Sequence, residues 1–504
     1  MEPVVQTSYG PVRGQIRDGV ASFLGIPYAA SPTGKLRFAA PVPPEPWTDV
    51  RDASAFGPTP PKPDYAPPFD RLLVEPSIPG DDWLNLNIWT ASDLTGPSPT
   101  ADRRPVMVWI HGGAFSNGNS ATPWYDGQAF GQAGVVLVTI NYRLGVDGFA
   151  LLPDAPPNRG LLDQVAALEW VRANIAAFGG DAGNVTIFGE SAGAMSVITL
   201  LAMPRAAGLF AKAIAQSGAA QAAADPADAA LVSGELGLAL GEALTDSDIS
   251  ANGLAEIELG TLIAAQAKVR DALATGPDPA RFGDTIVAGS IAFPPVIDGD
   301  VLPDHPLAAI TAGASSGVPM LIGTNTEEFR LFIVPPGTIN AISDELLPAV
   351  AAAFGATDKV VGLYRANRPD ATAGDIFAAL VTDKFFRLPA LAVAQARAGG
   401  PAATYFYEFA WGRPPIGAGH ALEIPFVFNN LERAAQDELI GPNPPQDLAD
   451  EMHRAWVRFA ASGDPGWPAF DDRRPVRIFD TGGGSVEHDP RGDERAIWTA
   501  GTVV

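Results

Sequence analysis

The sequence contains no cysteine in its 504 residues. This absence excludes disulfide bonds, thiolate metal ligands and a cysteine nucleophile together, so any catalytic nucleophile must be another residue type. Basic residues are also few, with 33 Lys and Arg against 57 Asp and Glu and a formal net charge of −24. An acidic surface repels nucleic-acid phosphates and anionic membranes. We therefore expect a small-molecule substrate, and neither nucleic acid nor a membrane as a partner.

Long apolar runs are missing too. No stretch of 18 apolar residues occurs, and the N-terminus MEPVVQTSYGPVRG lacks the basic and apolar segments of a signal peptide. We expect a cytoplasmic protein. With 47% hydrophobic and 18% charged residues, the chain can build a sizeable core. We predict one domain over residues 1–504, present as a monomer or a small homo-oligomer.

Proline is concentrated in residues 41–80, which we predict to be a surface loop beside the site because proline cannot cross the middle of a sheet. Short apolar runs rich in β-branched residues predict buried strands. They lie at 86–89, 106–110, 135–140, 185–188, 213–216, 319–322 and 404–409. A helix is predicted between 161 and 175, stopped by Gly179 and Gly180.

This order of strand, helix and strand predicts an α/β protein with a central, mostly parallel sheet flanked by helices. Residues 219–290 and 335–375 contain helical stretches that carry no motif. We expect them to be helical cap excursions that shape a substrate pocket.

The segment NVTIFGESAGAMSV contains the most informative motif. A strand ends at Phe188, residues 189–193 form a G-x-S-x-G turn, and a helix follows at once, as in the nucleophile elbow of the α/β-hydrolase fold. Ser191 is therefore the predicted nucleophile, although such a serine could also simply cap the helix.

A serine nucleophile needs backbone N–H groups that stabilise the negative charge developing on the substrate's carbonyl oxygen. The turn HGGAF at 111–115 follows an early strand and resembles the HGGG-type turns of esterases. The predicted oxyanion-hole donors are Gly113, Ala114 and Ala192.

The general base should be one of five histidines. His111 belongs to the glycine-containing turn, His305 to a Pro-Asp-His-Pro turn, His453 to a helix and His488 to an acidic segment near the C-terminus. His420, in a loop after the strand at 404–409, remains and is the predicted base.

The orienting acid should lie between Ser191 and His420 in the chain. Glu327 and Glu328 both follow the strand at 319–322, and their spacing alone does not choose between them. The acid would accept the Nδ1–H of the imidazole and fix its tautomer.

With these residues in view, the chain resembles the type-B carboxylesterases, the cholinesterase-like family, and most closely their bacterial para-nitrobenzyl-esterase group. The matching segments include FLGIPYA, DDWLNLNIW, NYRLG, FGESAGA, QSGA, HALEIPFVF and WVRFAASGDP, in this order. The family's G-x-x-x-D-E-G pattern places the acid on Glu328, with Glu327 in place of the Asp and Phe329 in place of the Gly. The resemblance also implies supporting roles for Glu190 and Ser217.

The resemblance implies a carboxylesterase that cleaves small to medium neutral apolar esters through a Ser-His-Glu triad. Two alternatives stay open: an amide or carbamate hydrolase with the same triad, and a binding protein of the same fold. The binding members lack catalytic residues that this chain keeps. The zinc-protease motif H-E-x-x-H and the phosphate-loop motif G-x-x-x-x-G-K-[ST] are both absent, so no metal and no other cofactor is expected.

Overall fold

The structure is a computed structural model that describes residues 2–93, 103–244, 249–434 and 438–499. Its main feature is an 11-stranded sheet with the order β14-β13-β12-β11-β10-β9-β7-β8-β6-β4-β3. The strands are β3 (Gln15–Arg17), β4 (Val20–Pro27), β6 (Asn85–Ala91), β7 (Arg104–Ile110), β8 (Val136–Ile140), β9 (Gly180–Glu190), β10 (Lys212–Gln216), β11 (Met320–Asn325), β12 (Thr404–Phe409), β13 (Pro475–Phe479) and β14 (Ser485–His488). A separate three-stranded sheet contains β1 (Val4–Gln6), β2 (Pro11–Arg13) and β5 (Arg51–Asp52).

The strands from β13 to β8 in this order are mutually parallel, whereas β14, β6, β4 and β3 pair antiparallel at the two edges. The predicted α/β architecture is thereby confirmed, and every predicted strand exists. Several strands extend beyond their predicted ranges, β9 most of all: it begins at Gly180 rather than at 185, because Gly180 already pairs with Arg104 of β7.

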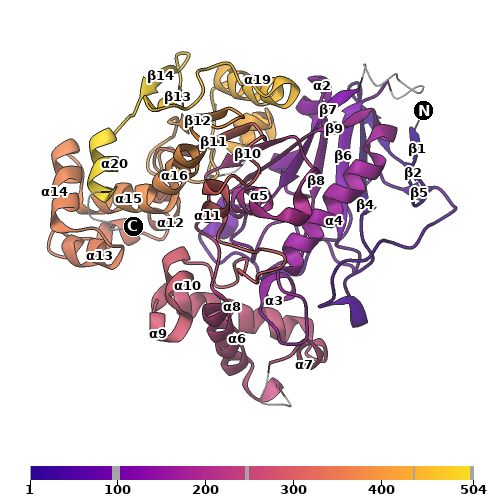
Figure 1. Cartoon of the computed structure of the whole chain (residues 1–504), viewed down its shortest axis with the longest axis horizontal. Helices are drawn as coiled ribbons and strands as arrows, with labels where there is room; N and C mark the ends of the chain where they lie inside the picture. The colour runs from indigo at the N-terminus through magenta and orange to yellow at the C-terminus, as the bar shows by residue number, and fades with distance from the viewer. Residues whose placement is uncertain (1, 94–102, 245–248, 435–437, 500–504) are drawn as a thin grey trace.

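Helices lie on both faces of the sheet and in two groups beyond it (Figure 1). They are α1 (Phe69–Leu72), α2 (Gln128–Gln132), α3 (Gly145–Phe149), α4 (Arg159–Asn174), α5 (Ala192–Ala202), α6 (Pro226–Leu240), α7 (Ala251–Ala255), α8 (Leu259–Thr275), α9 (Pro279–Phe282), α10 (Asp284–Gly289), α11 (Pro306–Thr311), α12 (Arg330–Ile333), α13 (Leu347–Ala353), α14 (Asp358–Asn367), α15 (Ala373–Thr382), α16 (Leu388–Arg397), α17 (Ile424–Val427), α18 (Leu431–Ala434), α19 (Gln446–Ser462) and α20 (Gly492–Thr499).

Strand β7 shows why the sheet is buried on both faces. Val106, Val108 and Ile110 belong to one hydrophobic cluster, together with residues of α4 and α5. Met107 and Trp109 belong to a second cluster on the opposite face, with residues of α17 and α19. Because successive side chains of a strand point to opposite faces, a continuous apolar run covers both sides.

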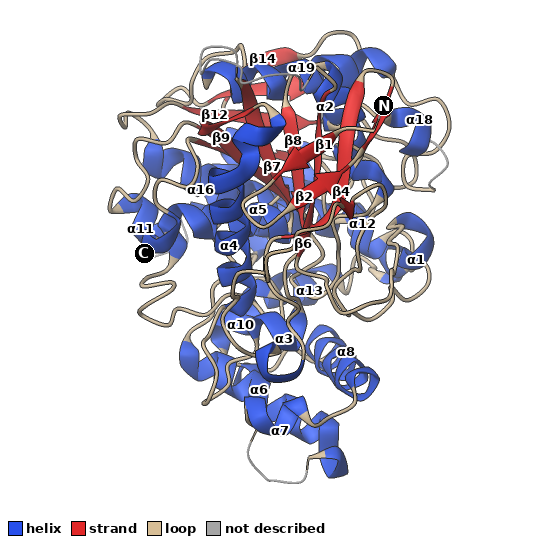
Figure 2. Cartoon of the chain, turned by 90° about the vertical axis from the view of Figure 1, so that its right-hand side faces the viewer, coloured by secondary structure: helices blue, strands red, loops and turns tan. Residues whose placement is uncertain are grey.

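Two helical groups correspond to the expected excursions. Helices α6 to α10 fall within residues 219–290 and lie below the sheet in Figure 2. Helices α13 and α14 fall within residues 335–375 and share a third hydrophobic cluster with α15. Residues 41–80 contain only β5 and α1 as regular strand and helix. No helix in the described ranges is both long and apolar enough to span a bilayer.

Candidate active site

Ser191 lies between the end of β9 and the start of α5, in a sharply bent turn. Its backbone angles are φ 55° and ψ −123°, a conformation that L-residues rarely adopt and that costs of order 1–3 kcal/mol. Such strain concentrates at active sites, where the surrounding structure holds it in place. The side chain is thereby lifted out of the strand, and the residue is half-buried.

The glycines of the turn are required by the neighbouring strand. A Cβ atom on Gly193 would lie 1.9 Å from the carbonyl oxygen of Ile110, and one on Gly189 would lie 2.5 Å from the same oxygen. No other residue therefore fits at either position without moving the backbone of β7. The G-x-S-x-G spacing reflects close packing of the turn against the sheet.

Residues 111–118, which we call the glycine turn, lie against this elbow. A Cβ atom on Gly112 would be 3.1 Å from the Cβ of Ser191. Gly113, Ala114 and Phe115 all have positive φ, and the N–H groups of Ser116 and Asn117 both donate to the Gly113 carbonyl. By contrast, within the described part of the chain the N–H groups of Gly113 and Ala114 donate to no backbone carbonyl.

His420 and Glu328 are brought together from positions 92 residues apart in the chain. The Nδ1 atom of His420 lies 2.7 Å from Oε2 of Glu328, and the Glu328 side chain is fully buried. The second carboxylate oxygen, Oε1, accepts a hydrogen bond of 2.8 Å from the backbone N–H of Asn325. Both carboxylate oxygens of Glu328 are therefore engaged, which fixes its orientation.

Glu327 has a different position. Both glutamates lie in the turn after β11 rather than in the strand itself, but the Glu327 side chain is 44% exposed. It accepts from the N–H of Ala418 at 2.9 Å and pairs with Arg330 at 3.5 Å. The geometry thus separates the two adjacent carboxylates and directs only Glu328 to the imidazole.

Glu190, the residue before Ser191, also faces the imidazole. Its Oε1 atom lies 3.1 Å from Nε2 of His420, and both side chains are buried. Burial opposes the charge on Glu190 and raises its pKa, whereas the neighbouring His420 lowers it, so Glu190 carries its charge when the imidazole is protonated. Burial alone would lower the pKa of His420, but Glu190 and Glu328 raise it to about 9.

A further buried carboxylate, Glu423, was not predicted from the sequence. Its oxygens accept from the side-chain amides of Gln216 at 3.1 Å and Asn325 at 2.8 Å, and burial raises its pKa. The Asn325 amide also donates to the carbonyl oxygen of Gly419, beside His420. The only sequence signal was its place in the segment HALEIPFVF.

Ser217 lies at the end of β10 with a φ of 53° and is fully buried. Its N–H donates to the carbonyl oxygen of Gly323. Within the described ranges its hydroxyl has no hydrogen-bond partner. The structure therefore places Ser217 directly after the strand next to the elbow, and among the described residues its hydroxyl makes no hydrogen bond to His420.

Two aromatic rings flank the imidazole. The ring centroids of Phe332 and Phe386 lie 5.3 and 4.9 Å from that of His420, and Phe332 is 37% exposed. Phe386 belongs to a π-helical turn, Asp383–Arg387, a feature that often occurs at functional sites. Sequence patterns did not predict that either ring lies beside the imidazole. The π-helical turn that carries Phe386 is not evident from hydrophobic spacing.

The other four histidines are placed elsewhere. Burial lowers the pKa of His111 to about 3, and its Nδ1 lies 2.8 Å from the Gly112 carbonyl oxygen. His453 is buried in α19, His305 caps α11, and His488 is exposed in β14. Among the described residues, no group of three or more His, Asp or Glu side chains could hold a metal ion.

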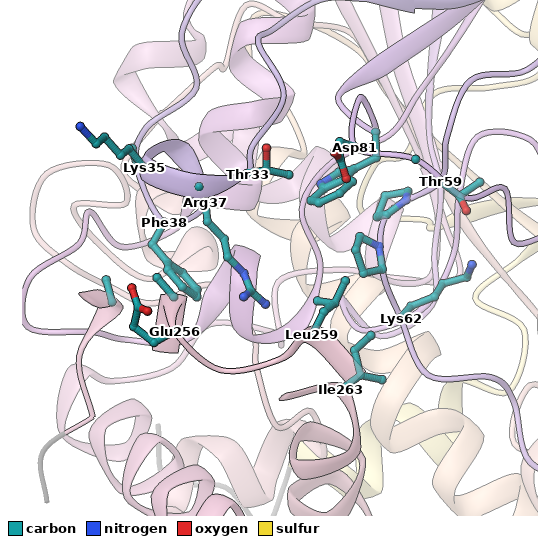
Figure 3. Close-up of a pocket in the computed structure, with 18 of the residues that line it drawn as sticks. Thr33, Lys35, Arg37, Phe38, Thr59, Lys62, Asp81, Glu256, Leu259 and Ile263 are labelled. Atoms are coloured by element: carbon teal, nitrogen blue, oxygen red, sulfur yellow. The ribbon is translucent and has the colours of Figure 1, made fainter. Parts of the chain in front are cut away.

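A pocket of about 1320 Å³ lies away from these residues (Figure 3). It is enclosed by residues 33–40, by parts of the proline-rich loop and by α7 and α8, with Phe38, Trp83 and Ile263 in its lining. Neither Ser191 nor His420 is among the described residues that line it. The pocket therefore belongs to a different part of the surface from the candidate active site.

Comparisons with known proteins show the family of the chain. The sequence model of the carboxylesterase family matches residues 1–478. A para-nitrobenzyl esterase of Bacillus subtilis is 38% identical over 98% of this chain and 97% of its own length. A solved carboxylesterase of Geobacillus stearothermophilus superposes with a TM-score of 0.82 at 38% identity, covering 98% of this chain and 99% of its own. A solved para-nitrobenzyl esterase superposes with a TM-score of 0.81 at 36% identity, again covering 98% of this chain and 99% of its own.

Proposed function

The chain belongs to the carboxylesterase family and is a serine hydrolase of the α/β-hydrolase fold, and from this premise we propose that Ser191, His420 and Glu328 are its catalytic triad. The 2.7 Å contact between His420 Nδ1 and Glu328 Oε2 is the observation that carries the proposal, and the strained elbow that holds Ser191 supports it. Sequence order supports it too, since serine, acid and histidine follow one another as in this fold.

In the proposed mechanism, the Ser191 hydroxyl attacks the ester carbonyl carbon while His420 Nε2 accepts its proton. The carbonyl oxygen becomes an oxyanion, which the N–H groups of Gly113, Ala114 and Ala192 stabilise. The imidazolium then protonates the leaving alcohol as the C–O bond breaks and an acyl-Ser191 ester remains. Water, deprotonated by the same imidazole, hydrolyses this ester and releases the acid.

The buried carboxylates support this mechanism electrostatically. The imidazolium exists only after proton transfer, and Glu328 at 2.7 Å and Glu190 at 3.1 Å both favour that charged form. Their attraction therefore lowers the energy of the charged intermediate more than that of the resting enzyme.

We further propose that the substrates are small to medium neutral apolar esters. Phe332 and Phe386 offer an apolar surface beside the imidazole, which suits an alkyl or aryl group. The neighbouring buried carboxylates would repel a substrate that carries its own negative charge.

Hydrolysis of para-nitrophenyl acyl esters of graded chain length, beside a matched anilide and a matched carbamate, tests the substrate class. We expect turnover of the esters with a preference for a short or medium chain. Faster turnover of the anilide or the carbamate would instead support the amide or carbamate alternative. Absence of turnover for all three would contradict the proposed catalysis.

A further inference from the structure

A buried ion pair lies next to the C-terminal half of the glycine turn. Lys62 and Glu75, both from the proline-rich loop, have side chains that are only 2% and 9% exposed, and their charged atoms are 3.8 Å apart. Burying two charges is costly unless their remaining hydrogen-bonding capacity is used. The position of this pair therefore needs an explanation.

The carboxylate of Glu75 binds the glycine turn directly. Its Oε1 atom accepts a hydrogen bond from the backbone N–H of Gly118, and its Oε2 atom accepts one from the Asn117 side chain at 3.5 Å. The Asn117 amide also donates to the Pro63 carbonyl oxygen at 2.7 Å. The C-terminal half of the glycine turn is thus held by the loop that carries Glu75.

This attachment continues to the proposed oxyanion donors. The N–H of Asn117 donates to the Gly113 carbonyl oxygen at 2.8 Å. Gly118 packs so closely that a Cβ atom there would lie 2.2 Å from the Gly112 carbonyl oxygen. A shift of Asn117 and Gly118 would therefore move Gly112 and Gly113, which lie beside Ser191.

Lys62 provides the countercharge. Its amine also donates to the Pro76 carbonyl oxygen at 3.3 Å, next to Glu75 in the chain. In Figure 3 this amine points away from Leu259 and Ile263, although Lys62 lines the same pocket. Burial lowers the pKa of Lys62 and raises that of Glu75, so each charge depends on the other.

From these contacts we propose that Glu75, held by Lys62, is a positioning residue that keeps the glycine turn in the geometry required for oxyanion stabilisation. The inference rests on the oxyanion hole of the proposed function. Glu75 touches no reacting atom in this account and acts only through the backbone of residues 113–118. Displacing a catalytic group by about 1 Å can lower the rate by on the order of 10²-fold.

The test compares Glu75→Leu, Glu75→Gln and a control, Glu235→Gln. Glu235 is a matched carboxylate because its side chain is 12% exposed and pairs with Arg281, but it lies on α6. For each variant, kcat and KM are measured with a para-nitrophenyl ester and normalised to the serine concentration titrated with an organophosphate. Inhibition constants are measured for a trifluoromethyl ketone, which forms an oxyanion adduct, and for the corresponding alcohol, which cannot.

We expect Glu75→Leu to lower kcat by between about tenfold and 10²-fold with KM changed less than twofold. Trifluoromethyl ketone inhibition should weaken in parallel, whereas alcohol inhibition should not change. The kcat of Glu75→Gln should lie between those of the wild type and Glu75→Leu, because an amide oxygen can still accept a hydrogen bond from the Gly118 N–H. Glu235→Gln should match the wild type.

Unchanged kcat and ketone inhibition in folded Glu75→Leu would overturn the inference. So would equal weakening of ketone and alcohol, which indicates a general loss of the pocket. If the leucine variant does not fold, the near-isosteric Glu75→Gln replaces it. The same two measurements then decide: the change in kcat, and the change in ketone inhibition relative to alcohol inhibition. Ser191→Ala separates the two proposals: residual turnover there refutes the triad, whereas an inactive Ser191→Ala with unaffected Glu75 variants refutes only this inference.

Discussion

His420 and Glu328 make the central contact of the candidate site, with 2.7 Å between Nδ1 and Oε2. Because the carboxylate occupies Nδ1, the neutral imidazole carries its proton there, and Nε2 keeps the lone pair that can act as a base. On the Nε2 side, Glu190 lies 3.1 Å away. The imidazole of His420 is thus held between the carboxylates of Glu328 and Glu190.

Ser191→Ala should abolish ester turnover, because no other group in the proposed mechanism can form the acyl intermediate. An organophosphate or a sulfonyl fluoride should label Ser191 in a 1:1 ratio, read by peptide mass spectrometry. Label on another residue, or substantial activity in the alanine variant, would show that the nucleophile is misassigned.

Glu328→Gln should lower kcat by orders of magnitude. In the serine-protease triad, the change of the carboxylate to its amide costs about 10⁴-fold, because the amide favours the wrong imidazole tautomer. Glu327→Gln is the matched neighbour and should cost tenfold or less, about 1.4 kcal/mol of barrier. Both variants need a folding check by circular dichroism, and the reverse ranking would move the acid to Glu327.

The activity should rise with pH through the ionisation of His420. Only the neutral imidazole is a base, and Glu190 and Glu328 raise the pKa of His420 to about 9. A raised pKa delays loss of the proton, so the rise in kcat/KM should be centred above pH 6.5, the ordinary value for histidine. Measurement of kcat/KM on an activated ester from pH 5 to 10 shows the midpoint.

Glu190→Gln should move that midpoint to lower pH. The charge of Glu190 is the largest single cause that raises the pKa of His420, and glutamine removes that charge. The variant should therefore keep a larger fraction of neutral imidazole at pH 7, while it loses electrostatic stabilisation of the imidazolium in the transition state. A midpoint that stays in place or moves upward would contradict the electrostatic coupling between these two residues.

Gly193→Ala should destabilise the protein by about 3 kcal/mol or more, because the added Cβ would lie 1.9 Å from the Ile110 carbonyl oxygen. Gly362→Ala is the control: Gly362 is exposed on α14 and a Cβ there meets nothing within 4 Å. Alanine should stabilise that helix by about 1 kcal/mol. Urea unfolding measures both changes, and equal effects would refute the close packing of the elbow.

Phe332→Ala and Phe386→Ala should each reduce the preference for apolar acyl or alkyl groups. Loss of one ring contact should lower kcat/KM for the best chain length by about tenfold, or about 1.4 kcal/mol, and less for the acetyl ester. The chain-length profile of para-nitrophenyl esters measures this. An unaltered profile in both variants would place the substrate's apolar group elsewhere.

Local sequence determined the strands, the elbow and the order of the proposed catalytic residues. A continuous apolar run forms a strand buried on both faces wherever helices cover the sheet, and G-x-S-x-G can bend only as it does because Gly189 and Gly193 lie against Ile110. Elimination among five histidines predicts His420 as the base. These features depend on short-range patterns or on the rarity of a residue type.

Tertiary structure alone decided which side chains meet. Glu327 and Glu328 are adjacent and chemically identical, and only the turn after β11 directs Glu328 to an imidazole 92 residues away. For the same reason, the sequence did not predict the contacts of Glu423, Phe332, Phe386 and Glu75. Their contacts depend on how separate loops pack at one edge of the sheet, and packing between distant segments leaves no periodic pattern in the sequence.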